Sequence, residues 1–406
     1  MTLPLEGITV VEVASNLAGP FAAEILAHMG ADVVKVERPE GGDDARGWGP
    51  PFWRGDSPAY LAMNANKRSI AVDLKDPAAV ARLADFIATR DVLVQNLRPG
   101  VMEELGLGSA AMLARNPRLV YCSLWAFGKD GPMKLRPGYE PMVQAFAGLM
   151  AVNGDEDSPP TRIGTSVLDF GTGMWAAMGA LGGLVQRQAT GRGCAVDASL
   201  FETALGWLTG HFAGYRASGE LPVRHRTGSR RLVVFQGFET KNGPIIIAAG
   251  NDRLFAKLAA VLGRPEWATD PRFATNADRI RNREALIPEV EKIVLTRTKG
   301  EWIDRLEEVG VPCAPIHAMD EALAHPQTAA TGMIQPVPEL DFELMGLPLS
   351  FDGARPGIRR APPKLGEHTE EILSATGSAL GSATGSALGG PTRVVGGSAG
   401  EKGAAR

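Results

Sequence analysis

One carboxylate stands alone in the most apolar stretch of the chain. Residues 164–185 read GTSVLDFGTGMWAAMGALGGLV, and Asp169 is the only charged residue among them. Aspartate favours the position just before a helix, so Asp169 could cap a buried helix that begins directly after it. A carboxylate at the mouth of such a helix could equally act as a nucleophile or a base. The spacing by itself favours the cap, and both roles stay open.

Basic residues follow several apolar runs and suggest a site for a phosphorylated ligand. Arg38 and Arg46 flank a glycine pair and two aspartates in VERPEGGDDARGWGP, and NANKRSI and QNLRPG add Lys67, Arg68 and Arg98. Arginine offers a forked set of donors that suits phosphate. The alternative is a set of solvated charged loops. The first loop, ASNLAGP, lacks the GxGxxG spacing of a dinucleotide site.

The elements that must position these residues alternate between strand and helix. Apolar, β-branched runs at 7–13 and 31–37 enclose a helical pattern over 21–30, which is a βαβ unit. The same rhythm continues through a strand at 69–74, a helix at 77–90, and strands at 91–96 and 118–125. The pattern predicts an α/β fold with a doubly wound parallel sheet. Ligands of such sheets bind at the carboxyl ends of strands, here the loops after Val13, Glu37 and Gln95.

The rhythm breaks at the basic, turn-rich stretch PVRHRTGSRRL. We predict a large α/β domain over residues 1–215, a smaller α+β domain over 225–328, and a return segment to the large domain over 329–373. Residues 374–406, which include a repeated SATGSALG unit, hold too little apolar bulk to fold and are predicted to be a disordered tail.

Composition excludes several function classes. The net charge of −4 and the absence of a basic block argue against nucleic acid as a partner. Three distant cysteines and six scattered histidines predict no disulfide framework and no metal site. The N-terminus lacks the features of a signal peptide, and the glycine-rich run after Asp169 favours a core helix over a membrane span. We therefore expect a cytoplasmic enzyme without a membrane partner.

Eight motifs occur in an order that resembles one known family. They are LAGPFAAEILAHMGADVVKVERPEGGDDARGWGP, NANKRSIAVDLK, VLVQNLRPGVMEELGLG, GPMKLRPGYEPMVQAFAGLM, TSVLDFGTG, GRGCAVDASLFETAL, GVPCAPI and APPKLGEHTEEIL. Together they resemble the class III coenzyme A transferases, the CaiB/BaiF family, whose relatives include formyl-CoA transferases and α-methylacyl-CoA racemases. The resemblance covers residues 5 to 373.

The resemblance implies a covalent mechanism at Asp169. Its carboxylate would attack an acyl-CoA thioester to give an aspartyl-acyl anhydride, and the CoA thiolate would then form an aspartyl-CoA thioester and release the donor acid. An acceptor carboxylate would take the acyl-transfer steps in reverse. Burial would raise the pKa of Asp169 and the helix N-terminus would lower it. We expect Gly171 and Gly173 to admit the bulky thioester, and the cap and nucleophile roles to be compatible.

The resemblance also assigns binding roles and an assembly. It places Arg38 at the nucleotide phosphates and Val72, Asn96 and Leu97 along the adenosine and pantetheine of coenzyme A. The substrate-lining positions that it implies are Asn16, Leu17, Tyr139 and Glu140. Val72 and Leu97 could instead be core residues, and Tyr139 a buried hydrogen-bonding tyrosine. Coenzyme A and a small carboxylic acid would be substrates, no cofactor would be tightly bound, and the family fold is an interlocked homodimer.

Two departures narrow the activity. Leu17 stands where formyl-CoA transferases carry glutamine, and the glycine run of those enzymes is missing from RTGSRRLVVFQGF, which disfavours formate and oxalate. The rival activity is an α-methylacyl-CoA racemase or epimerase. Those relatives pair the aspartate with a histidine in the stretch that here reads PGYE, and proton transfer on both faces of the α-carbon needs two bases. The arginines of RHRTGSRR suggest a dicarboxylate substrate such as succinate, on charge alone.

Overall fold

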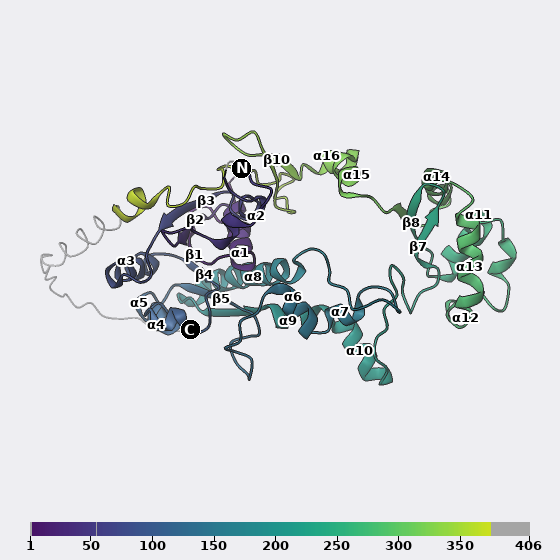
Figure 1. Cartoon of the computed structure of the whole chain (residues 1–406), viewed down its shortest axis with the longest axis horizontal. Coiled ribbons are helices and arrows are strands. Elements are labelled where there is room, and N and C mark those ends of the chain that lie inside the picture. The colour runs from purple at the N-terminus through teal and green to yellow at the C-terminus, as the bar shows by residue number, and fades with distance from the viewer. Residues whose placement is uncertain (1, 54, 375–406) are drawn as a thin grey trace, which may run out of the picture.

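A six-stranded parallel sheet forms the centre of the chain in the computed structural model, which describes residues 2–53 and 55–374 (Figure 1). The strand order is β3-β2-β1-β4-β5-β6, with every neighbouring pair parallel. The strands are β1 Thr9–Val13, β2 Asp32–Glu37, β3 Lys67–Ala71, β4 Val92–Gln95, β5 Val120–Trp125 and β6 Ala195–Ser199. Because the chain leaves β1 in one direction for β2 and β3 and returns on its other side at β4, the order reverses between β1 and β4. The predicted doubly wound α/β sheet is confirmed.

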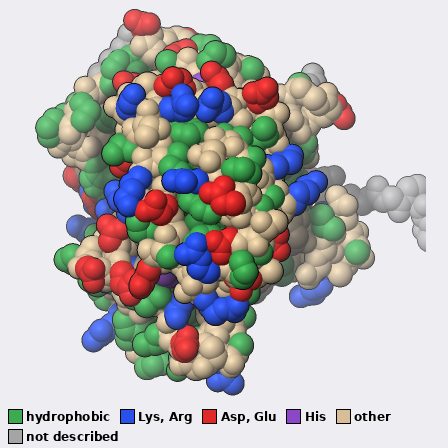
Figure 2. Space-filling view, turned by 90° about the vertical axis from the view of Figure 1, so that its right-hand side faces the viewer, with side chains coloured by type: hydrophobic (Ala, Val, Ile, Leu, Met, Phe, Trp, Pro, Cys, Tyr) green, Lys and Arg blue, Asp and Glu red, His purple; other side chains and the backbone are tan. Residues whose placement is uncertain are grey.

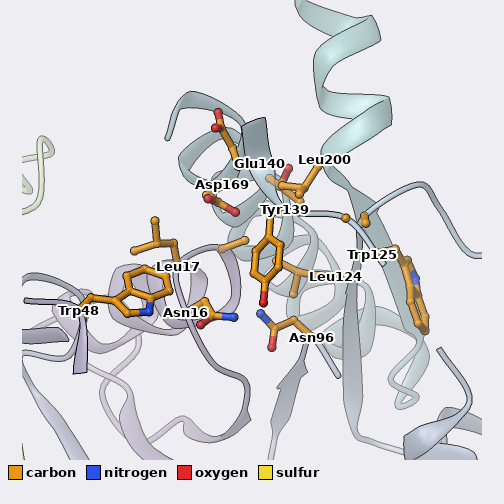
Figure 3. Close-up of a pocket in the computed structure, with 14 residues that line it drawn as sticks. Asn16, Leu17, Trp48, Asn96, Leu124, Trp125, Tyr139, Glu140, Asp169 and Leu200 are labelled. Carbon is orange, nitrogen blue, oxygen red and sulfur yellow. The ribbon is translucent and has the colours of Figure 1, made fainter. Parts of the chain in front are cut away.

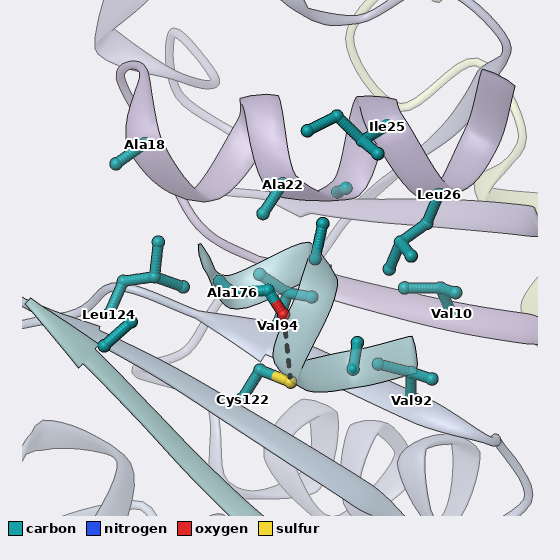
Figure 4. Packing of buried hydrophobic residues seen from close by; sticks show 14 of the residues in the cluster. Val10, Ala18, Ala22, Ile25, Leu26, Val92, Val94, Cys122, Leu124 and Ala176 are labelled. Atoms are coloured by element: carbon teal, nitrogen blue, oxygen red, sulfur yellow. Dashed lines mark hydrogen bonds between the residues drawn. The ribbon is translucent and has the colours of Figure 1, made fainter. Parts of the chain in front are cut away.

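Helices cover both faces of this sheet. On one face, α1 and α8 pack on β1, β4 and β5 through small and branched residues such as Ala22, Ala176, Val94 and Cys122 (Figure 4). On the other face, α3 and α5 bury Leu83, Phe86 and Met112 against the same strands. The helices of this large unit are α1 Ala18–His28, α2 Pro58–Met63, α3 Pro77–Ala88, α4 Val101–Glu104, α5 Ser109–Arg115, α6 Glu140–Phe146, α7 Leu149–Val152 and α8 Val167–Thr190, with the 3₁₀ turn η1 Asp44–Gly47.

A small unit with its own apolar core follows. Its antiparallel sheet has the order β7-β8-β9, formed by Phe235–Thr240, Gly243–Ala248 and Cys313–Pro315. Trp302, Phe255 and Leu286 fill the core between this sheet and its helices. Those helices are α11 Asp252–Val261, η2 Pro265–Ala268, α12 Asn276–Arg281, α13 Arg283–Val294 and α14 Lys299–Glu308. Acidic and basic side chains are interspersed over the outer face of this end of the molecule (Figure 2).

Two separate segments connect the small unit to the large one (Figure 1). The outgoing segment carries α9 Leu200–Trp207 and α10 Thr209–Ser218, and the returning one carries α15 Met319–Ala324, α16 Pro326–Thr331, β10 Ile334–Pro336 and β11 Glu343–Met345. The returning chain then reaches β3, where the amide of His368 donates to the carbonyl of Ser69 at 2.9 Å. The predicted tail lies, apart from Ser374, outside the described residues.

Helix α8 differs from its prediction in two ways. It begins at Val167, two residues before Asp169, so Asp169 is the third residue of the helix and Ser166 holds the cap position. It is also buried on one side only, because Met174, Trp175 and Met178 are about half exposed. Within the described ranges no helix combines the length and apolarity needed to cross a membrane. In the same ranges no group of three or more metal-ligating side chains is gathered.

Candidate active site

A pocket opens where the strand order reverses, at the carboxyl ends of β1 and β4. The loop after β1 and the loop after β4 are tied together, because Ser15 N donates to Asn96 Oδ1 at 2.9 Å and Asn96 Nδ2 donates to Ser15 O at 2.8 Å. We call this the switch-point pocket. It is lined by Asn16, Leu17, Ala18, Trp48, Asn96, Leu124, Trp125, Ala126, Gly138, Tyr139, Glu140, Asp169, Thr172 and Leu200 (Figure 3). The pocket lies at the strand ends that the sequence pattern indicated.

Gly19 allows the first loop to approach β4 so closely. A Cβ atom at this position would lie 2.4 Å from the Cβ of Ala14 and 3.3 Å from the side chain of Asn96. Any larger residue would therefore push the first turn of α1 away from the Asn96 side chain. The single glycine of ASNLAGP therefore allows close packing at the floor of the pocket and is not part of a dinucleotide-binding motif.

Asp169 is partly buried in the pocket wall, in the first turn of α8. The pKa of its carboxyl is raised from 3.8 to about 7, chiefly by burial and also by the nearby charge of Glu140, while Arg162 acts in the opposite direction. The helix N-terminus favours the anion by only about 0.3–1 kcal/mol, so desolvation dominates. Asp169 is thus poised to titrate near neutral pH. The predicted cap role is wrong, because the helix begins before it.

Tyr139 and Glu140 flank Asp169 from the start of α6. Glu140 is 3% exposed, and its Oε1 accepts from the backbone amide of Leu168 at 3.3 Å, next to Asp169. Tyr139 is 67% exposed, which contradicts the alternative of a buried tyrosine, and its ring extends toward the side of the pocket that Asn16 and Asn96 line (Figure 3). Asn16 and Leu17 come from the loop before α1. All four predicted substrate-lining residues therefore meet Asp169 in one pocket.

Gly171 and Gly173 do not face the pocket. A Cβ atom at Gly171 would lie 2.3 Å from the indole of Trp207 in α9, and one at Gly173 would lie 2.8 Å from the carbonyl of Ala18 in α1. Both glycines therefore let neighbouring helices pack closely on α8. The expectation that they admit a thioester is wrong, because both positions face neighbouring helices.

The four predicted coenzyme A contacts lie in different surroundings. Arg38 is exposed at the end of β2, where its Nε donates to the Glu40 carbonyl at 2.9 Å and its Nη2 pairs with Asp44. Asn96 lines the switch-point pocket. The side chain of Val72 is buried in the core and that of Leu97 packs against the same core. Val72 and Leu97 could therefore meet a ligand chiefly through backbone atoms.

Three of the predicted phosphate-binding cations are instead structural. Arg46 is buried and makes a bidentate pair with Glu37, both contacts at 2.8 Å, while its guanidinium lies 3.7 Å from the centre of the Tyr60 ring. Lys67 is fully buried, and Arg68 pairs with Asp32 and Glu371. Lys67 and Arg68 begin β3, so they lie at the amino ends of the strands, opposite the carboxyl ends that hold the pocket. The prediction that three basic loops share one end of the sheet is wrong, because of the five predicted cations only Arg38 and Arg98 are exposed in the loops after β2 and β4.

A buried ion network supports the floor of the pocket. Lys35 Nζ lies 2.6 Å from Glu12 Oε1 and 2.8 Å from Asp43 Oδ2, and Lys67 Nζ lies 2.8 Å from Glu12 Oε2. Asp43 Oδ1 also accepts from the backbone amide of Asn16 at 2.9 Å and so fixes this residue at a φ of 69°. Burial raises the pKa of Asp43, but Lys35 and the Asn16 amide outweigh it and leave that pKa below its usual value. The network therefore holds a pocket-lining loop in an unusual conformation.

Eight of the fourteen lining residues were not predicted as site residues, among them Trp48, Trp125 and Thr172. Trp48 ends the turn after η1 and is 43% exposed, Trp125 ends β5, and Thr172 lies one turn after Asp169. The prediction for the loop VERPEGGDDARGWGP rested on its charged residues and overlooked Trp48. An aromatic residue between two glycines, in the loop that follows a predicted strand, was the available signal.

Comparison with known proteins identifies the family. The model of CoA-transferase family III matches residues 5–369. The chain is 36% identical to mouse succinyl-CoA:glutarate CoA-transferase, over 91% of this chain and 86% of that protein. It is 37% identical to the acetyl-CoA:oxalate CoA-transferase of Acetobacter aceti, over 90% and 93%. A CaiB/BaiF family crystal structure from Brucella suis superposes with a TM-score of 0.83 at 36% identity, over 93% of this chain and all of that one. The fold, the pocket and these matches agree: the chain belongs to CoA-transferase family III and is a CoA-transferase.

Proposed function

We propose that this enzyme moves coenzyme A from an acyl-CoA to a dicarboxylic acid, with Asp169 as the covalent nucleophile. The observation that carries the proposal is the setting of Asp169: a partly buried carboxylate of raised pKa, in a pocket at the carboxyl ends of β1 and β4. Removing water from a carboxylate makes it a stronger nucleophile, and a pKa of about 7 leaves it about half ionised at neutral pH.

The reaction would proceed in four acyl transfers. Asp169 Oδ attacks the thioester carbonyl, the C–S bond breaks, and a mixed anhydride and CoA thiolate form. The thiolate attacks the aspartyl carbonyl, which releases the donor carboxylate and leaves an aspartyl-CoA thioester. The acceptor carboxylate attacks that thioester to give a second anhydride and free the thiolate. The thiolate then attacks the acceptor's acyl carbon, and Asp169 leaves as a carboxylate.

The residues that line the pocket and its surroundings support a binding role for each part of the substrate. We propose that Arg38, exposed beyond the end of β2, meets the nucleotide phosphates and that Asn96 contacts the pantetheine on its way to Asp169. Backbone atoms of Val72 and Leu97 would complete that path. Leu17, Trp48 and Tyr139 offer the acyl group apolar surface beside the Asn16 amide.

A dicarboxylic acceptor longer than oxalate fits this lining best. The two named relatives above act, by their names, on succinyl-CoA with glutarate and on acetyl-CoA with oxalate. Leu17 presents a methyl-bearing side chain that would contact the methylene groups of a longer acid such as succinate or glutarate. The racemase alternative lacks support from the pocket, since the described lining residues include Glu140 but no histidine as the second base.

We further propose that the enzyme is a homodimer. Neighbouring helices α6, α8, α9 and α10 expose large apolar side chains, each 40–63% accessible: Met142, Phe146, Met174, Trp175, Met178, Leu205, Trp207, Phe212 and Tyr215. A contiguous apolar surface of this kind marks an association interface in a water-soluble protein. Sedimentation equilibrium should give twice the chain mass, and a monomer at micromolar concentration would contradict the assembly.

Trapping the intermediate tests the mechanism. The enzyme is incubated with succinyl-, glutaryl-, acetyl- and oxalyl-CoA, quenched with hydroxylamine, and digested for peptide mass spectrometry. We expect a hydroxamate at Asp169, most abundant with succinyl- or glutaryl-CoA and absent from Asp169→Asn. Asp157→Asn, an exposed aspartate, is the matched control and should label normally. An unmodified Asp169 with every thioester would refute the covalent mechanism, and α-proton exchange in deuterated water would then favour the racemase.

A further inference from the structure

The loop between α7 and α8 brings an arginine to the far side of Glu140. Arg162 Nη2 lies 3.2 Å from Glu140 Oε2, and the Glu140 side chain is only 2% exposed while that of Arg162 is 42% exposed. The Oε2 atom of Glu140 thus faces this arginine. The other oxygen, Oε1, accepts from the amide of Leu168 beside Asp169. The carboxylate of Glu140 therefore lies between Arg162 and the first turn of α8.

A fully buried glutamine fixes this arrangement. Gln144 Nε2 donates to Glu140 Oε1 at 2.6 Å and to the carbonyl of Ile163 at 3.3 Å, and Gln144 Oε1 accepts from the amide of Ile163 at 3.0 Å. One side chain therefore holds both the carboxylate and the backbone next to Arg162. Such a network orders an otherwise exposed loop at one defined place.

Two carboxylates near each other in a partly dry pocket disfavour each other's charge. Glu140 and burial both raise the pKa of Asp169, and Arg162 lowers it. The other elements packed on this turn of α8 present uncharged groups there, such as Phe21 of α1 and Thr203 of α9. Glu24, further along α1, is paired with His28 at 3.5 Å.

We propose that Arg162 is a positioning residue that holds Glu140 in its Gln144-bound orientation and so keeps Asp169 available as a carboxylate nucleophile at neutral pH. This inference rests on the proposed nucleophilic role of Asp169. Acylation removes the negative charge of Asp169 and with it the repulsion from Glu140, so this pair favours the covalent intermediate. Arg162 limits the same repulsion in the free enzyme, where the carboxylate must be ionised to react.

The test measures the rate of Asp169 labelling by succinyl-CoA between pH 5 and 9 for wild type, Arg162→Gln and Arg162→Lys. In Arg162→Gln we expect the acid limb of the profile of labelling rate against pH to move to higher pH. The rate should fall roughly two- to fivefold at pH 7 and recover to within about twofold of wild type at pH 9. Arg162→Lys should resemble the wild type. Arg192→Gln removes another exposed guanidinium, just beyond the far end of α8, and should change nothing.

The possible outcomes distinguish the nucleophilic role of Asp169 from the positioning role of Arg162. If the wild type is never labelled at Asp169, the proposed function fails first. If wild-type labelling follows a limb near neutral pH and Arg162→Gln has the same limb, only the role of Arg162 is refuted. A loss of rate that is uniform from pH 5 to 9 would also overturn it, because a merely structural contribution would not depend on the ionisation of Asp169.

Discussion

The large unit buries carboxylates in two opposite electrostatic settings. In the buried ion network, Glu12 and Asp43 are paired with Lys35 at 2.6 and 2.8 Å, and the pKa of Asp43 is lowered. In the switch-point pocket, Asp169 has a carboxylate neighbour in place of a paired cation, and burial together with that neighbour raises its pKa to about 7. The chain supplies counter-ions where a carboxylate holds the loop, whereas within the described residues no cation pairs directly with Asp169, the carboxylate that we propose as the nucleophile.

The comparison also distinguishes what each setting contributes to the pocket. The network fixes Asn16 through the Asp43 carboxylate, so it contributes geometry. In the mechanism that we propose, Asp169 contributes reactivity at the cost of stability, as active-site groups commonly do.

Removing the cation of the network should give the largest effect. Lys35→Met leaves Glu12 and Asp43 buried with an incomplete set of partners, and breaking a buried ion pair on one side costs about 3–5 kcal/mol. We expect the free energy of unfolding, measured by urea denaturation at pH 7.5, to fall by that amount.

Lys75→Met is the matched control, because Lys75 is exposed, and it should stay within about 0.5 kcal/mol of wild type. A Lys35→Met protein as stable as the control would mean that the network carries no more of the fold than a surface charge.

The sequence predicted most of this sheet because its strands are apolar, β-branched runs. It missed β6, whose residues AVDAS are partly exposed at the sheet edge and lack such a run. It also placed β3 two residues late, since Lys67 and Arg68 do not look like strand residues. Lys67 is accepted there because Glu12, 55 positions away, neutralises it inside the protein. Local patterns cannot encode a partner that only the fold supplies.

The same limit explains the errors at the site. Asp169, Glu140, Tyr139, Asn16 and Leu17 could be gathered from the family resemblance, and the rule for strand ends also pointed to the loop that holds Asn16 and Leu17. That Arg46 is occupied by Glu37 depended on side-chain pairing that spacing does not show. The glycines after Asp169 were predicted to face a ligand, but which face of α8 they occupy is decided by α1 and α9, which pack against them.

Removing the charge of Asp169 should stabilise the protein. Its folded-state pKa of about 7 exceeds the ordinary value of 3.8, so the native state holds this proton more tightly and loses stability as the pH rises from 4 to 7. Asparagine does not titrate. We expect Asp169→Asn to gain on the order of 2–4 kcal/mol at pH 8, after allowance for its partial exposure, and progressively less toward pH 4.

Thermal denaturation at pH 8 and pH 5 measures this gain. Asp157→Asn, at an exposed position, should show no comparable pH-dependent gain. An Asp169→Asn variant that is no more stable than wild type at pH 8 would show that the pocket does not penalise the carboxylate, and the contrast with Asp43 would disappear.

The smallest effect should come from weakening the repulsion within the pocket. Glu140→Gln keeps the size of the side chain but removes the charge that raises the pKa of Asp169. With each rate of Asp169 labelling taken relative to the same variant's rate at pH 9, we expect this variant to react roughly two- to fivefold faster than wild type at pH 6. Glu284→Gln, exposed in the small unit, is the control for loss of one negative charge. A limb that stays in place in Glu140→Gln would leave burial as the sole cause of the raised pKa, and would make the difference between the two carboxylate settings one of solvation instead of charge.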